Sequence, residues 1–118
     1  MLDNPPAAVL IAEARKALEE GLAPGFPQKV AANAVGIAER ELELGPEFAA
    51  AEMTRLMALV GETGDLAARN RRLAEAVRTG AIALDDAALI DHLILTAIAK
   101  LEIDQPGYPA FRQWQEVA

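Results

Sequence analysis

The feature that most constrains this chain is its strong bias toward helix. Alanine is the commonest residue, with 26 of 118 positions, and Leu, Glu and Arg add further helix-forming residues. Val and Ile recur at helical spacing, and no alternating apolar and polar stretch bounded by turn residues predicts a strand. The sequence therefore predicts an all-α fold.

Proline and glycine positions divide the chain into five predicted helices, at about residues 5–20, 28–44, 46–60, 65–79 and 85–103. Asn4 is the expected N-cap of the first helix, and Gly45-Pro46 is expected to separate the second from the third. Asp65 and Gly80 bracket the fourth. Short loops favour antiparallel neighbours, so we expect one domain over residues 1–118, a single up-and-down helical bundle of about five helices. Residues 104–118 form a short tail that packs on the bundle or on a partner.

Composition excludes several classes of function. The chain has no cysteine and no serine, so it lacks a disulfide, a thiolate metal site and a serine nucleophile. A single histidine, His92, cannot build a His-rich metal site, and no cofactor motif is present. The net charge of -7 argues against nucleic-acid binding. No apolar run is long enough to span a membrane and the first residues do not resemble a signal peptide, so we expect a cytoplasmic protein.

The helix predicted at 85–103 is apolar around too much of its circumference for an ordinary surface helix. About half of that circumference is covered by seven residues: Leu89, Ile90, Leu93, Ile94, Ala97, Ile98 and Leu101. Leu95 and Ile103 lie outside this arc. Such a helix is either central in its bundle or buried in a dimer interface.

Several polar side chains fall on or beside apolar helix faces and form a candidate internal polar cluster: Asn33, Arg40, Glu41, Asn70, Lys100 and Asp104. A buried charge is costly unless it is paired, so Glu41 is expected to pair with Lys100 or Arg40. One interpretation is a satisfied network that fixes helix register. The other is a small functional site with Glu41 as a base and Lys100 as an anion holder. The structural interpretation is favoured.

Two further groups of side chains each allow a structural and a functional interpretation. The helix at 65–79 carries Arg69, Arg71, Arg72 and Arg78, which are read as surface pairs rather than as a site for a phosphate-bearing ligand. The tail carries Tyr108, Phe111 and Trp114, spaced by three and so on one face of a helical turn. These aromatics either cap the bundle core or contact a partner.

The motifs in these helices resemble a family of short bacterial all-helical proteins of unknown function (DUF6285-like). Four segments carry the resemblance. They are residues 30–34 leading to 40–42, residues 70–80 with their Arg-Thr-Gly ending, residues 100–104 followed by Pro106 and Tyr108, and the opening Asp3-Asn4-Pro5-Pro6. Genes of that family often lie beside aminoglycoside-phosphotransferase-like kinases and acyl-CoA dehydrogenases. The resemblance therefore implies an accessory role near such enzymes. The chain departs from the family pattern at Gln105 and Gly107, where an Asn and a basic residue are expected.

Together these features predict a non-catalytic interaction protein that binds a protein partner or itself and needs no cofactor. The partner would be a phosphotransferase-like kinase or an acyl-CoA enzyme. The alternative is a small-molecule-binding protein or enzyme with an internal polar site around Glu41 and Lys100.

Overall fold

The computed structural model describes residues 4–118, so Asp3 of the opening motif lies outside the described residues. The all-α class is confirmed, because the described residues form five helices and no strand. The helices are α1 (Ala7–Glu20), α2 (Phe26–Val60), α3 (Leu66–Thr79), α4 (Ala87–Asp104) and α5 (Pro109–Val117).

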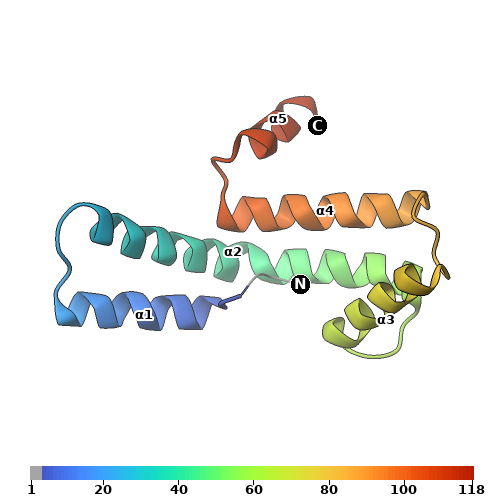
Figure 1. The fold of residues 1–118 in the computed structure, drawn as a ribbon, viewed down its shortest axis with the longest axis horizontal. Helices are drawn as coiled ribbons and strands as arrows, with labels where there is room; N and C mark the ends of the chain where they lie inside the picture. Colours follow the sequence, from blue (N-terminus) through green and yellow to red (C-terminus); the bar gives the residue numbers. More distant parts are fainter. Residues whose placement is uncertain (1–3) are drawn as a thin grey trace.

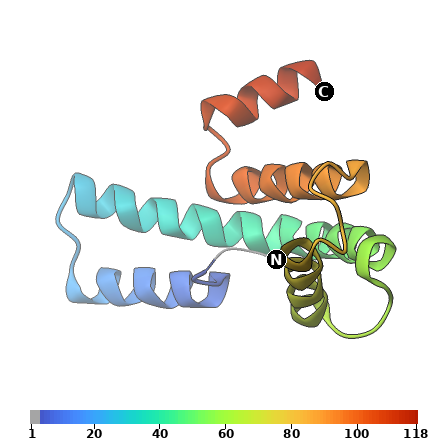
Figure 2. The same cartoon turned by 45° about the vertical axis from the view of Figure 1, so that its right-hand side comes forward.

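Helices α1, α3 and α4 are arranged along α2, and α5 packs against α4 (Figures 1 and 2). At 1.5 Å per residue, a helix of 35 residues spans roughly 52 Å, and the longest dimension of the molecule is 52 Å. Helix α1 lies antiparallel to the first half of α2, and α4 lies antiparallel to the second half (Figure 1). Helix α3 packs near the end of α2, while α5 doubles back beside α4 (Figure 2). Among the five described helices, α1 packs only against α2.

The predicted break at Gly45-Pro46 is wrong, because both residues lie inside α2. Proline removes one backbone donor, here the partner of the Leu42 carbonyl, but its fixed φ is compatible with a helix. The continuous helix is supported on both sides of Pro46, since the first half packs against α1 and the second against α3 and α4. Tertiary packing therefore outweighs the local preference for a stop.

The helix ends agree with the sequence at α3 and differ at α1 and α5. Asp65 caps α3 by accepting a hydrogen bond of 2.8 Å from the backbone N–H of Ala68. Gly80 ends that helix in the left-handed conformation, at φ +79°. The expected cap at Asn4 is wrong, because α1 begins after Pro6 and has no side-chain cap. The expected short tail contains a helix of nine residues, α5.

The apolar core lies where the second half of α2 meets α3 and α4. Its buried centre consists of Leu56, Leu73 and Leu89. Five partly buried residues surround this centre: Leu59, Val60, Leu66, Val77 and Ile82. Helical spacing places Leu66, Leu73 and Val77 on one apolar face of α3, and all three belong to this core. None of the described helices is both long enough and apolar enough to cross a membrane.

Candidate functional site

The residues of the predicted polar cluster lie in two separate places. Asn33, Arg40, Glu41 and Asp104 line one groove, whereas Asn70 and Lys100 line hollows between α2, α3 and α4. Position along α2 explains this division, since Glu41 precedes Pro46 and the hollows begin at Phe48. Glu41 and Lys100 thus line different cavities.

The groove has a volume of about 790 Å³ and lies where the start of α1, the middle of α2 and the α4–α5 connection meet. Besides the four cluster residues, it is lined by Asn4, Pro5, Leu10, Ile37 and residues 105–109. Helix α2 contributes the amide of Asn33, the guanidinium of Arg40 and the carboxylate of Glu41. Asp104 adds a second carboxylate from α4. The walls can therefore offer both donors and acceptors to a polar molecule.

Arg40 joins α2 to the end of α4. Its Nε donates a hydrogen bond of 2.6 Å to the carbonyl of Ile103. Gly36 leaves space for the guanidinium, because a Cβ at that position would lie 3.2 Å from Nη1 of Arg40. A cation beside the last carbonyls of a helix is favourable, since those carbonyls carry the negative end of the helix dipole. Arg40 therefore has a structural role whatever else the groove binds.

A second polar cluster lies beside the apolar core. Glu52 on α2 is only 5% exposed and accepts a hydrogen bond of 3.2 Å from Nδ2 of Asn70 on α3. The same Nδ2 donates to the carbonyl of Leu66 at 3.0 Å. The amide therefore satisfies a buried carboxylate and links α3 to α2.

Arg55 connects α2 to α4 through two neutral acceptors. Its Nε donates to Nδ1 of His92 at 3.0 Å, and its Nη2 donates to the hydroxyl of Thr96 at 3.2 Å. His92 is 2% exposed. Burial, and then the nearby Arg55 cation, lower the pKa of His92 below its ordinary value. The ring is thus held neutral, with Nδ1 free to accept the hydrogen bond.

Sequence reasoning missed Glu52, Arg55 and the role of His92. A signal for Glu52 was present, because it lies four residues from both Phe48 and Leu56 on the apolar face of α2. Arg55 and His92 are 37 residues apart, and no local pattern predicts their contact. For His92, the sequence bears on metal binding alone. Among the described residues, no group of three or more His, Cys, Asp or Glu could hold a metal ion.

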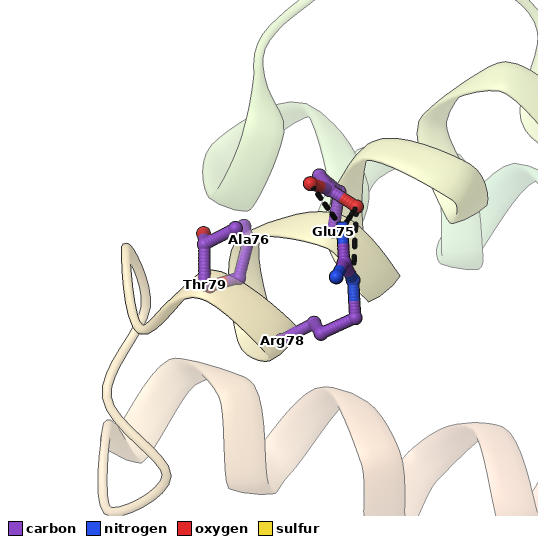
Figure 3. Close-up of polar contacts among 4 residues, drawn as sticks. All are labelled: Glu75, Ala76, Arg78 and Thr79. Carbon is purple, nitrogen blue, oxygen red and sulfur yellow. Dashed lines mark hydrogen bonds and ion pairs between the residues drawn. The ribbon is translucent and has the colours of Figure 1, made fainter.

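Three of the four α3 arginines bind groups near their own helix. Arg69 is buried and donates to the carbonyls of Gly64 and Glu62, so it holds the preceding loop. Arg72 donates to the carbonyl of Thr63. Arg78 pairs with Glu75 at 2.6 Å (Figure 3). Among these three, the expected surface pairing holds for Arg78 alone, because Arg69 and Arg72 bind backbone carbonyls and Arg69 is buried.

The tail aromatics differ in burial. Phe111 is 3% exposed, so it anchors α5. Tyr108 lines the groove and is 48% exposed, while Trp114 is 36% exposed. The burial of Phe111 therefore leaves Tyr108 and Trp114 as the two tail aromatics with exposed surface.

Comparison with known proteins gives a family without a known activity. No curated protein and no solved structure matches the chain. Residues 12–108 match the family described as Domain of unknown function (DUF6285). This range contains all six residues of the predicted polar cluster, together with Glu52, Arg55 and His92. The chain therefore belongs to the DUF6285 family, whose function is unknown.

Proposed function

We propose that this protein is a non-catalytic interaction protein that associates with a second copy of itself through the outer face of α4. The observation that carries the proposal is an apolar stripe on this face, formed by Ile90, Leu93, Ile94 and Ala97. The first three are 41%, 53% and 41% exposed. Spacings of three and four residues place all four on one side of the helix, away from buried His92.

The surface area of the chain supports association. A compact monomer of this mass exposes about 6,200 Å², whereas this chain exposes 7855 Å². The radius of gyration is 17.2 Å, against about 13.5 Å for a compact domain of this length. The excess of roughly 1,700 Å² per copy lies within the range of about 1,000–2,500 Å² that obligate homodimer interfaces bury on each partner.

The chemistry of the stripe favours a second copy over a charged partner. Its centre is apolar, and two of the four charged residues of α4, Asp91 and Glu102, lie on one flank. Obligate homodimer interfaces resemble such a surface, with an apolar centre and a polar rim. Ala97 is small and exposed, so it permits close approach of two helices. A two-fold axis would cover the same stripe on both copies.

The test is sedimentation equilibrium of the wild-type chain and two variants. Wild type is expected to be a dimer, and Ile94→Glu is expected to be a monomer because it places a charge in the apolar centre. Leu18→Glu is the matched control, since Leu18 is 63% exposed on α1 and lies off the stripe. This control should stay dimeric. A monomeric wild type, or an Ile94→Glu variant that remains dimeric, overturns the proposal.

An accessory role beside a phosphotransferase-like kinase or an acyl-CoA enzyme is a further proposal, carried by the family resemblance. It is tested by affinity capture from the native host with wild type and Trp114→Ala. Trp114 is the partly exposed aromatic of α5, and such residues dominate interface energetics. Recovery of neither enzyme class would contradict this role.

A second candidate function is ligand binding in the groove that contains Arg40, Glu41 and Asp104. The groove volume of about 790 Å³ and its mixed charges favour a polar molecule. A screen of polar metabolites by ligand-observed NMR, with Glu41→Gln as the variant, tests this candidate. Hits that bind equally well to Glu41→Gln would exclude a role for that carboxylate. Lys100→Met should leave binding in the groove unchanged, because Lys100 lines a separate hollow.

A further inference from the structure

A smaller hollow lies between α2, α3 and α4, apart from both the α4 stripe and the groove. Its volume is about 330 Å³, near the lower end of the range for ligand pockets. Its polar lining consists of Glu52, Arg55, Thr96 and Lys100. We propose that this pocket binds a small organic carboxylate with an apolar body, through the guanidinium of Arg55.

Arg55 is suited to receive an anion because its hydrogen-bond partners are neutral. Nε is bound to an imidazole and Nη2 to a hydroxyl, so neither contact cancels the positive charge. These two bonds use Nε and Nη2 and do not involve Nη1. A guanidinium held by neutral groups keeps its charge and a fixed orientation, which favours a charge-assisted bond to a carboxylate.

His92 keeps this arrangement in one protonation state. Because Nδ1 accepts the hydrogen bond from Arg55, the ring proton is placed on Nε2. Burial and the Arg55 cation both lower the pKa of His92, so the ring stays neutral near pH 7. A protonated ring would repel the guanidinium and would lose its acceptor. The histidine thus acts as a positioning residue for Arg55.

The remaining walls define the class of ligand. Glu52, Arg55 and Lys100 together carry one net positive charge, which matches a single carboxylate rather than a phosphate dianion. The other wall is apolar: Phe48, Ala49, Leu66, Ala67 and Ala99. A short aliphatic or aromatic acid satisfies both walls.

The test is isothermal titration of the full chain with benzoate, with benzyl alcohol as the neutral analogue and inorganic phosphate as the anion without an apolar body. Benzoate is expected to bind about tenfold or more tightly than either control, because it alone uses both walls. Arg55→Gln should weaken benzoate binding by about tenfold or more. Arg71→Gln is the matched control, since Arg71 is exposed on α3 outside the pocket, and it should bind as wild type does.

A second variant keeps the test decisive if Arg55→Gln fails to fold. Ala99→Leu leaves the guanidinium in place and fills the pocket, so it should abolish benzoate binding while circular dichroism stays unchanged. The Ile94→Glu variant should still bind, which separates this site from self-association. The proposal is overturned if wild type does not bind benzoate, if benzyl alcohol or phosphate binds as well, or if Ala99→Leu binds as wild type does.

Discussion

The two halves of α2 belong to regions that are packed very differently. In the N-terminal hairpin, formed by α1 and residues 26–44, the buried side chains are the alanines Ala7, Ala14 and Ala38. In the C-terminal unit, formed by residues 46–60 with α3 and α4, the core consists of three leucines and five partly buried neighbours. Large apolar residues of the hairpin remain outside, as Phe26 at 79% exposed illustrates.

This difference shows which region carries the stability of the chain. Burying an alanine removes far less apolar area from water than burying a leucine, so the hairpin gains less per residue. Close packing through alanines brings two helices together, but it leaves their larger side chains on the surface. The C-terminal unit also contains the buried polar links from Glu52 and Arg55. The hairpin should therefore open more readily than the C-terminal unit.

The largest effect should follow from truncating the core. Leu56 is fully buried against Leu73 and Leu89, so Leu56→Ala is expected to lower the free energy of unfolding by about 2–5 kcal/mol. The same change at exposed Leu18 in the hairpin should cost less than about 0.5 kcal/mol. Urea denaturation at one protein concentration measures both. Equal losses would show that the two regions do not differ as their burial indicates.

A substitution at Pro46, where the two regions meet, tests whether the break in the α2 hydrogen bonds lowers the stability of the chain. Pro46→Ala restores a backbone donor for the Leu42 carbonyl and is expected to raise the free energy of unfolding by about 1–3 kcal/mol. Pro27, in the first turn of the same helix, is the control, because its missing N–H would be unpaired anyway. Pro27→Ala should change stability by less than about 0.5 kcal/mol. Destabilisation by Pro46→Ala would mean that α2 requires the proline at its midpoint.

The region around Pro46 also shows which features of the fold can be predicted from the sequence. The helical class, the cap at Asp65 and the core stripe on α3 follow from composition and periodicity, because those signals are local. The stop predicted at Gly45-Pro46 is also local, and it was wrong because packing on both sides of that site maintains the helix. Local rules therefore work where the surrounding structure does not oppose them.

The candidate sites depend on register between helices, which periodicity does not supply. Glu41 and Lys100 both fall on apolar arcs, yet Glu41 lies on the first half of α2 and Lys100 lines a hollow beside the second half, so they line different cavities. The contact between Arg55 and His92 arises only when α4 is laid antiparallel on α2. A sequence can therefore identify which polar side chains turn inward without identifying which of them meet.

The pH dependence of stability should report on the C-terminal unit alone, because His92 is the single histidine of the chain. Its pKa is lowered in the fold, so below about 6.5 the unfolded chain binds a proton that the folded chain does not. The contribution of His92 is thus complete above that pH and is lost as the pH falls. Urea denaturation between pH 8 and pH 5.5 measures it. The decline should be weaker in His92→Gln, and an identical decline would assign it to other groups.

The smallest effect should come from surface ion pairs, and it should be the same in both regions. Glu75 and Arg78 on α3 lie 2.6 Å apart but are 58% and 73% exposed, so their coupling is expected to be about 0.5 kcal/mol or less. Arg15 and Glu19 on α1 form the matching pair in the hairpin, at 3.9 Å. Double-mutant cycles with alanine at low and high salt measure both couplings. If the two are equally small, the difference between the regions lies in buried packing. A coupling above about 1 kcal/mol in α3 alone would mean that surface charge contributes to it.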